Sequence, residues 1–534
     1  MNDKVPPTAS NRRKGELARE GDLVTYKRKR KTIDPTTVVP PNTVESANEG
    51  VSEPVPPLKG SQFDTESAQA VLGAQPPLPN VSPDSDVNIS IVGGDSKSEG
   101  ATSNEDVGPS DISLLRSFKF HRARSIALGQ EKLPLRVHHH PPTWDLTKEP
   151  QAVQDYVKLK GLDRIGAISY NSYNSALISA FAERWQPKTS SFQLKWGEMT
   201  PTFDYMEQLV RLRADGDATV IAGSWGFPAL VEVFENNLLQ GLKAFKALKA
   251  GGAGNLLSLK KLRDHYAYKL GKVLNDGTAT SAKKKKGLTA KSVARAYMLY
   301  VCGSFLFSTK KGTNVNARYL DLFAKDKVAK KWSWGSAVLA HMYYNLGAAS
   351  RDDGRQVACC TTLLEKWDAS ITDRYAAPAL LMFREALDKY KLEDVVWGPY
   401  RNKRDSAHAF KEFTFFNGVL ASPDHVQPYY PNRVVRKFNQ EQGIPGKRLI
   451  TEILNLWSAE SPRKFNHKYE WVDCFSGQKW KDFVLKKADR GRRVREGPLV
   501  CTEGYLEWFA SVSWTTICPI VVDLAADDDA RVHQ

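Results

Sequence analysis

The sequence has few cysteines and no long hydrophobic run. Its 534 residues include only six cysteines, which form neither a disulfide framework nor a Cys-x-x-Cys metal-binding pair. We interpret them as buried free thiols in a reducing compartment. The absence of any run of about 18 or more apolar residues excludes a transmembrane helix. The N-terminus lacks an apolar signal core, so we expect a soluble intracellular protein.

Aromatic residues are nearly absent from the first 110 residues. Only Tyr26 and Phe63 occur there, whereas all 13 tryptophans lie further along the chain. A segment rich in Pro, Ser, Asn and Asp cannot bury enough apolar surface to offset its chain entropy. We therefore predict four parts: a disordered basic and polar tail at 1–110, a transitional linker at 111–154, one globular domain at 155–515 and a C-terminal tail at 516–534.

Positive charge exceeds negative charge, with a formal net charge of +16. A basic balance favours acidic partners such as nucleic acid, or nuclear import receptors. Two basic clusters lie in the predicted tail with residues 15–26 between them: Arg12, Arg13 and Lys14, then Lys27, Arg28, Lys29, Arg30 and Lys31. This spacing is typical of a bipartite nuclear localisation signal read by an import receptor. A solvated charge run or a nonspecific nucleic-acid arm remains the alternative.

A second basic region covers residues 479–495, where Trp480 and Phe483 lie among the charges. Aromatic side chains could stack on bases or pack against a core. The candidate nucleic-acid contacts in this region are Lys486, Lys487, Arg490, Arg492, Arg493 and Arg495. Lys283–Lys286 form another basic run, for which a solvated loop is the favoured interpretation.

The apolar periodicity predicts helix after helix with few alternating strands. We expect helices at 171–185, 203–213, 229–248, 289–307, 334–346, 356–367, 378–391, 432–442, 447–457 and 505–509, and a short hairpin around 192–197. Thr289 and Ser333 are candidate helix caps. The predicted fold class is mainly α, a multi-helix globular array with a few short β-hairpins.

Residue patterns for metal sites or catalysis are weak. His138–His140 have no second His or Cys cluster at ligand spacing, so we expect a loop without metal. The two-metal site of a metallophosphatase needs paired Asp, His and Asn ligands, which the scattered histidines do not supply. Asp321, Glu365 and Asp394 could converge as an acidic triad, but nothing in the sequence singles them out.

Six sequence blocks, taken in order, resemble the plant mobile domain family. They are Ala182–Thr189 (AERWQPKT) with Ser191–Leu194 and Gly197–Thr200 (GEMT), Ala294–Tyr300, Ser333–Ala340, Gln356–Trp367, Arg433–Phe438 (RVVRKF) and Gly504–Phe509 (GYLEWF). The resemblance covers about residues 155–515. The sequence departs from the family pattern after Thr200, where Pro201 and the following residues replace the usual continuation.

The resemblance implies a transposon-derived domain of the Maintenance of Meristems type, which also occurs in long-form serine/threonine phosphatase 7 homologues. It implies a nuclear, non-enzymatic protein-interaction scaffold linked to transposon silencing, genome stability and meristem maintenance. Its expected partners are nuclear proteins, among them a phosphatase-like relative. The alternative function is a nucleic-acid-binding accessory protein of a transposable element.

Some members of the family carry the name "aminotransferase-like", which the residues do not support. A pyridoxal enzyme needs a Schiff-base lysine, a carboxylate for the pyridinium nitrogen and a phosphate-binding turn on alternating strands and helices. The pattern of this chain lacks that alternation. We therefore expect no cofactor, no catalytic residues and no membrane partner.

The residues of the blocks also have structural interpretations. Trp185, Trp334, Trp367 and Trp508 are expected core anchors, because large aromatic side chains dominate core burial. For Glu198 and Glu507 we expect capping or internal ion pairs. Arg295, Arg433 and Arg436 could contact phosphate, or serve in internal ion pairs or stacking.

Overall fold

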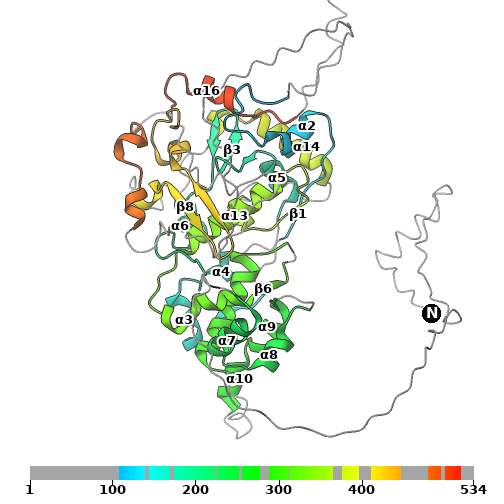
Figure 1. The fold of residues 1–534 in the computed structure, drawn as a ribbon, viewed down its shortest axis with the longest axis vertical. Helices are drawn as coiled ribbons and strands as arrows, with labels where there is room; N and C mark the ends of the chain where they lie inside the picture. Colours follow the sequence, from blue (N-terminus) through cyan, green and yellow to red (C-terminus); the bar gives the residue numbers. More distant parts are fainter. Residues whose placement is uncertain are drawn as a thin grey trace, which may run out of the picture. The chain divides into compact units, whose positions relative to one another are not determined.

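The computed structural model describes residues 107–138, 143–168, 173–221, 223, 225–251, 255–276, 288–310, 312–364, 376–395, 410–446, 479–494 and 500–518 (Figure 1). Nearly all of the predicted tail at 1–110, most of the predicted C-terminal tail and the helix predicted at 447–457 lie outside these residues. The boundaries of the predicted parts therefore remain predictions. Among the described residues, no helix has the length and apolar character needed to cross a membrane.

Helices dominate the described residues, which confirms the predicted mainly α fold class. The α-helices are α2 (Arg122–Ala127), α3 (Gln151–Leu159), α4 (Ile165–Ile168), α5 (Ser175–Ala182), α6 (Phe203–Gln208), α7 (Phe227–Leu238), α8 (Leu242–Leu248), α9 (Leu259–Tyr266), α10 (Lys269–Asp276), α12 (Ala290–Val301), α13 (Trp334–Ala349), α14 (Ala376–Lys389) and α16 (Tyr505–Val512).

Short 3-10 turns connect these helices. They are η1 (Phe118–Phe120), η2 (Leu146–Lys148), η4 (Ala317–Phe323), η5 (Lys325–Lys327), η6 (Thr361–Leu363), η8 (Leu392–Asp394), η10 (Glu412–Phe415), η11 (Pro431–Arg433), η12 (Val435–Phe438), η13 (Lys479–Phe483) and η14 (Lys487–Arg490). A π-helical turn, η3 (Cys302–Leu306), continues α12.

Within the described ranges the strands are short and form four small sheets. β2 (Trp185–Gln186), β3 (Ser191–Leu194) and β4 (Gly197–Met199) form an antiparallel meander at the hairpin predicted around 192–197. β8 (Gly418–Ala421) and β9 (Val426–Tyr429) form an antiparallel hairpin. β5 (Leu256–Ser258) pairs antiparallel with β6 (Asn314–Asn316), and β1 (Arg136–Val137) pairs parallel with β7 (Gln356–Val357).

Helix α12 lies in the main core. The Thr289 hydroxyl accepts from the Ser292 backbone N–H, and the Ser292 hydroxyl accepts from the Thr289 N–H, which completes a capping box. Almost every side chain of α12 is buried, and the helix packs against α3, α7 and α9. The predicted helix at 289–307 is therefore confirmed, with its last turn in π form.

Helix α13 is the second central helix and is buried on nearly all sides. It packs against α6, β8 and β9, and the Trp334 indole N–H donates to the Lys160 carbonyl at 2.9 Å. In Figure 1, α13 lies between the group formed by α7, α8, α9 and α10 and the group formed by α2, α5, α14 and α16.

Several predicted helices differ in the structure, and the one at 203–213 ends with α6 at Gln208. The helix predicted at 229–248 is divided into α7 and α8, because Leu239 adopts a left-handed conformation with φ of 55° at the end of α7. The predicted helix at 356–367 begins instead as strand β7, and that at 432–442 consists of the turns η11 and η12. At β7 the pairing with β1, a tertiary contact, outweighs the apolar spacing.

The predicted linker at 111–154 contributes side chains to the core. Leu135, Val137 and Trp144 pack in the main cluster, whereas Leu115 and Phe118 form a smaller cluster with Ile517 from the other end of the chain. The described part of this segment is therefore an integral part of the folded unit.

Candidate functional site

The block Glu183–Trp185 ends α5 and begins the β2–β3–β4 meander. Glu183 is fully buried, and its carboxylate is held by two guanidinium groups. Arg122 of α2 lies 3.0 Å away through Nε, and Arg384 of α14 approaches both carboxylate oxygens at 2.7 Å. This carboxylate therefore links three helices.

Arg184, the next residue, is also fully buried and forms an ion pair with Asp388 of α14. Asp388 in turn accepts hydrogen bonds from the backbone N–H groups of Ile517 at 3.1 Å and Cys518 at 2.9 Å. Burial lowers the pKa of Arg184, and the Asp388 carboxylate opposes this effect. The pair therefore ties α5 and α14 to the C-terminal segment.

Glu198, in the GEMT block on β4, forms a second buried ion pair. Its Oε1 accepts from Arg433 Nε at 2.9 Å and from the Ser191 hydroxyl at 2.6 Å. Both Glu198 and Arg433 are almost completely buried. The geometry therefore shows an internal ion pair, which was the structural interpretation for Glu198 and Arg433.

Arg436 of η12 lies between aromatic rings. Its guanidinium carbon is 5.4 Å from the Trp196 ring centroid and 5.6 Å from that of Tyr505, and its Nη2 donates to the Trp196 carbonyl at 2.7 Å. Gly197, at φ of +134°, has no Cβ and leaves room for this guanidinium. The blocks GEMT, RVVRKF and GYLEWF thus meet in one cluster.

Lys437 is a buried lysine beside this cluster. Its ammonium donates to the Thr200 carbonyl at 2.6 Å and lies 3.7 Å from the centroid of the Tyr205 ring. Burial lowers the pKa of Lys437 to about 7, although the nearby Asp204 carboxylate raises it. At neutral pH this amine is therefore partly uncharged inside the protein.

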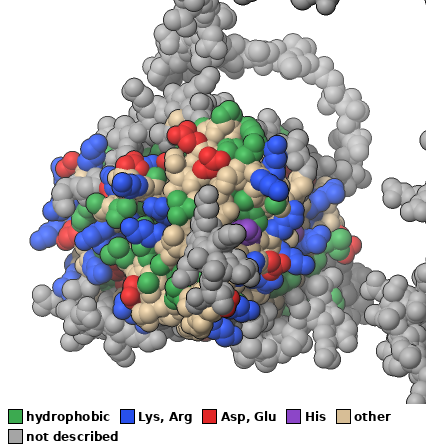
Figure 2. Space-filling model, turned by 90° about the horizontal axis from the view of Figure 1, so that it is seen from below, with side chains coloured by type: hydrophobic (Ala, Val, Ile, Leu, Met, Phe, Trp, Pro, Cys, Tyr) green, Lys and Arg blue, Asp and Glu red, His purple; other side chains and the backbone are tan. Residues whose placement is uncertain are grey.

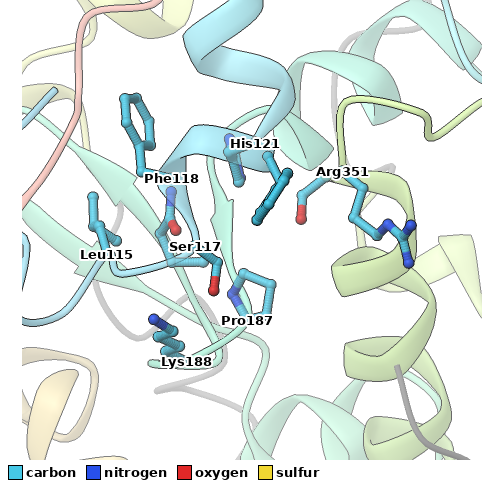
Figure 3. Close-up of a pocket in the computed structure, with 10 residues that line it drawn as sticks. Leu115, Ser117, Phe118, His121, Pro187, Lys188 and Arg351 are labelled. Atoms are coloured by element: carbon cyan, nitrogen blue, oxygen red, sulfur yellow. The ribbon is translucent and has the colours of Figure 1, made fainter. Parts of the chain in front are cut away.

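A small pocket follows the Glu183–Trp185 block, lined by Leu115, Ser117, Phe118, Phe120, His121, Gln186, Pro187, Lys188, Ser350 and Arg351 (Figure 3). Its volume of about 20 Å³ holds roughly one water molecule, which is too little for a cofactor. Burial, with a smaller contribution from Arg116, lowers the pKa of Lys188 to about 8.

His121 in this pocket uses both ring nitrogens inside the protein. Nε2 lies 2.9 Å from the Trp185 carbonyl oxygen, and Nδ1 accepts from the Ala123 backbone N–H at 3.1 Å. Burial lowers the pKa of His121 to about 4, so the ring is neutral at physiological pH. Its role here is to join α2 to β2.

A larger open groove lies between α7 and the turns η4 and η5. Its volume is about 830 Å³, within the range of ligand-binding clefts. The lining residues are Trp225, Ala229, Glu232, Val233, Asn236, Asn237, Asp321, Ala324, Lys325 and Asp326. The sequence blocks give no signal for this groove, because its two walls come from segments about 90 positions apart.

The structure separates the predicted nucleic-acid contacts. Lys486, Lys487, Arg492 and Arg493 are exposed, and Arg492 lies 3.3 Å from the Glu441 carboxylate. Arg495 lies outside the described residues, as do all eight residues of the predicted nuclear localisation signal and Lys283–Lys286.

Arg490 does not fit the predicted surface role. Its side chain is mostly buried, with Nη2 2.7 Å from the Glu412 carboxylate, Nε 2.8 Å from the Leu485 carbonyl oxygen and the guanidinium 4.1 Å from the Phe415 ring centroid. Trp480 and Phe483 pack at the edge of the main core. Arg490 is therefore a packing residue in this structure.

Another basic surface was not singled out by the sequence. The helices α8, α9 and α10 and the start of α12 expose Lys243, Lys246, Lys260, Lys261, Lys269, Lys272 and Lys291. Figure 2 looks onto this end of the molecule and shows many Lys and Arg side chains spread over it. On each of these short helices the lysines lie away from the apolar stripe. Comparing their positions with that stripe in the sequence could have identified this surface.

The described residues contain no group of three or more His, Cys, Asp or Glu placed to hold a metal ion. His138 lies 2.9 Å from the Gln356 side-chain oxygen, whereas His139 and His140 are outside the description. Asp321 forms an ion pair with Lys327, and Asp394 accepts from the Lys391 backbone N–H. Glu365 is not described, so the acidic triad has no structural support.

Two of the four expected tryptophan anchors are confirmed. Trp185 and Trp334 are fully buried in the main core, and Trp508 is partly exposed beside Arg433. Trp367 lies outside the described residues. Arg295 is buried on α12 and donates to the Asn237 carbonyl at 3.4 Å, which favours its structural interpretation.

Comparison with known proteins finds similarity in the region that contains four of the six sequence blocks. The plant mobile domain model matches residues 161–371, so the blocks at 433–438 and 504–509 lie beyond it. Protein MAIN-LIKE 1 of Arabidopsis thaliana is 27% identical over 448 residues, covering 77% of this chain and 81% of that protein. Protein MAINTENANCE OF MERISTEMS of the same plant is 29% identical over 429 residues, covering 74% and 81%.

A further relative is longer. The serine/threonine-protein phosphatase 7 long form homolog of Arabidopsis thaliana is 25% identical over 466 residues, which is 78% of this chain but 32% of that protein. No solved structure matches the chain significantly. Residues 161–371 of the chain therefore match the plant mobile domain, and the chain is similar to these relatives over about three quarters of its length.

Proposed function

We propose that this protein acts in the nucleus as a non-enzymatic scaffold that binds partner proteins and supports meristem maintenance, genome stability and transposon silencing. The observation that carries the proposal is that charged residues of the sequence blocks pair with each other or with other residues inside the fold. Glu183, Arg184, Glu198 and Arg433 form buried internal ion pairs, so their charges are neutralised within the fold. Such buried pairs join distant elements of the fold, and the charges of these four residues are not free for acid–base chemistry.

The names of the relatives support the proposed role in meristem maintenance and the proposed phosphatase-like partner. One relative carries maintenance of meristems in its name, and another is a phosphatase homolog of greater length. We therefore propose nuclear proteins as partners, including a phosphatase-like relative with a plant mobile domain. The basic cluster Lys27–Lys31 would deliver the chain to an import receptor.

The test is proximity labelling in plant nuclei with the full-length chain. The variant replaces all five residues of Lys27–Lys31 by Ala, and the matched control replaces Lys283–Lys286, a basic run elsewhere in the chain. We expect nuclear protein partners for wild type and control, and their loss in the variant. A wild-type chain that stays in the cytoplasm, or labels no nuclear protein, would contradict the proposal.

The exposed lysines of α8, α9 and α10 favour nucleic-acid binding as a second candidate function. Lys243, Lys246, Lys260 and Lys272 have no carboxylate partner among the described residues. Elsewhere on the described surface lysines do form ion pairs, as Lys389 does with Glu385. Neighbouring positive charges repel each other, and a phosphate backbone would relieve that repulsion.

The test of this second function is salt-dependent binding to duplex DNA and to duplex RNA. The slope of log affinity against log salt is negative. Replacing Lys243, Lys246, Lys260 and Lys272 by Ala should reduce the size of this slope by about one for each phosphate that the variant no longer binds. The control replaces the exposed Lys389 and Lys391 and should keep the slope. Equal slopes in all three proteins would rule out this surface.

A further inference from the structure

The groove between α7 and η4–η5 leaves part of one face of α7 exposed. Ala229, Glu232, Val233 and Asn236 recur on α7 at intervals of three and four residues, so they lie along one face and form one wall. The opposite wall consists of Asp321, Ala324, Lys325 and Asp326. At a rise of about 1.5 Å per residue, the α7 wall is about 10 Å long, which matches about three residues of an extended peptide.

The charge of the groove is negative. Three carboxylates line it, on Glu232, Asp321 and Asp326, against the single ammonium of Lys325. Asp321 is paired with Lys327, whereas Glu232 and Asp326 have no cationic partner among the described residues. The chain as a whole has a net charge of +16, whereas the groove is acidic. The groove therefore attracts cationic partners, which the rest of the protein repels.

Asn237 gives an independent indication of a ligand. Asn237 is one of the residues that line the groove, and it is only 2% exposed. The amide nitrogen donates to the Val233 carbonyl at 2.8 Å, which fixes the orientation of the amide, and Oδ1 has no hydrogen-bond partner. A buried acceptor without a donor is unfavourable, and a donor from a bound molecule would satisfy it.

We propose that this groove binds a short extended segment, rich in lysine or arginine, from a partner protein. A cationic side chain lies between Glu232 and Asp326, a nitrogen of the segment donates to Asn237 Oδ1, and the Trp225 ring offers an aromatic surface for a second cation. The proposal rests on the scaffold function and names its partner class. Nucleic acid and acidic segments are disfavoured, because the two unpaired carboxylates repel them.

The test measures binding of a fluorescein-labelled peptide of alternating lysine and arginine to the purified full chain. Fluorescence anisotropy should show saturable binding that weakens with salt, and no binding of a peptide with glutamate at the same positions. The double variant Glu232→Gln and Asp326→Asn should bind roughly tenfold more weakly. The matched control is Glu235→Gln, an exposed residue of the same helix that does not line the groove, and it should bind like wild type.

A further variant tests the opposite direction. Lys325 is exposed in the wall, so Lys325→Glu should fold normally and bind the basic peptide more tightly, by roughly threefold to tenfold. Unchanged affinity in both groove variants, or no saturable binding to wild type, would overturn the proposal. If nuclear labelling then still finds partners, the scaffold function stands without the groove. If the peptide binds through the groove but no nuclear partner is labelled, the groove stands and the scaffold function falls.

Discussion

Glu198 Oε2 lies 2.7 Å from Arg433 Nη2, although 235 positions separate the two residues in the sequence. Both side chains are almost inaccessible to solvent. The pair joins strand β4 to the turn η11, so two blocks that are far apart in the sequence form one structural unit. Both charges have lost their hydration on burial. Each one is therefore unfavourable in the folded state unless the other charge is present.

The first prediction concerns this pair. The variant Glu198→Gln removes the negative charge and leaves Arg433 buried without its counterion. We expect a loss of about 3–5 kcal/mol in the free energy of unfolding. The measurement is urea unfolding followed by tryptophan fluorescence.

The control for this prediction is Glu393→Gln. Glu393 pairs with Lys391, and both side chains are more than two-thirds exposed, at 74% and 72%. An exposed pair contributes little, so the change should stay within about 0.5 kcal/mol. Similar losses for both variants would show that burial does not determine the contribution of the ion pair.

The second prediction concerns Gly197, which combines a φ of +134° with a close neighbour. A Cβ at this position would overlap Arg436 Nη2 and lie 3.0 Å from the Tyr505 hydroxyl. We expect Gly197→Ala to cost more than about 2 kcal/mol of stability, because backbone strain and displacement of the guanidinium add together.

Gly129→Ala separates these two effects. Gly129 also has a positive φ, of +77°, but a Cβ there would meet no atom within 4 Å. Its cost should be only about 1 kcal/mol, from backbone strain alone. Thermal unfolding of both variants measures the difference, and equal shifts would argue against the clash with Arg436.

The third prediction is a pH dependence that originates from Lys437. Burial lowers the pKa of its ammonium to about 7 in the folded state, below the value of 10.5 expected in the unfolded chain. Between these two values the unfolded state binds more protons, so the free energy of unfolding contributed by Lys437 rises with pH. Below pH 7 both states are protonated, and the dependence disappears.

The variant Lys437→Met removes this titration and keeps a side chain of similar length. The difference in stability, wild type minus variant, should increase from pH 7 to pH 9 by up to about 1.4 kcal/mol per pH unit. Urea unfolding at pH 6, 7, 8 and 9 measures it. Parallel curves for the two proteins across this range would show that Lys437 keeps an ordinary pKa.

The fourth prediction separates packing from surface charge in the basic region at 479–495. Arg490→Ala removes the interactions with Glu412, the Leu485 carbonyl and the Phe415 ring, so we expect a loss of about 1–2 kcal/mol. Lys486→Ala changes an exposed side chain and should alter stability by less than about 0.5 kcal/mol. Chemical unfolding of the two variants, compared with wild type, provides the measurement.

Affinity for DNA gives the complementary measurement. If nucleic acid binds this region, Lys486→Ala should weaken binding, whereas Arg490→Ala should not weaken it beyond its effect on folding. A specific loss of affinity in Arg490→Ala alone would show that its guanidinium reaches a phosphate in spite of its burial.

The sequence determined the mainly α fold class and several individual elements. Local signals were sufficient where a cap and an apolar stripe agreed, as at Thr289 and α12, or where a block predicted a turn, as at Gly197 and β4. The order of the six blocks also indicated the similarity to the plant mobile domain family, because that order is a property of the chain alone. The basic clusters of the predicted tail predict a nuclear address from the same local information.

Tertiary structure decided what the blocks do. Glu183, Arg184 and Glu198 acquire their partners from α2, α14 and η11, and no local pattern specifies contacts that span 61 to 235 positions. The same applies to Arg490, which the sequence placed on a surface and folding placed against Phe415. The groove beside α7 exists because η4 packs against that helix and the adjoining η5 contributes to the opposite wall. Sequence periodicity reports which face of an element is apolar, whereas pairing between distant elements depends on the whole packed core.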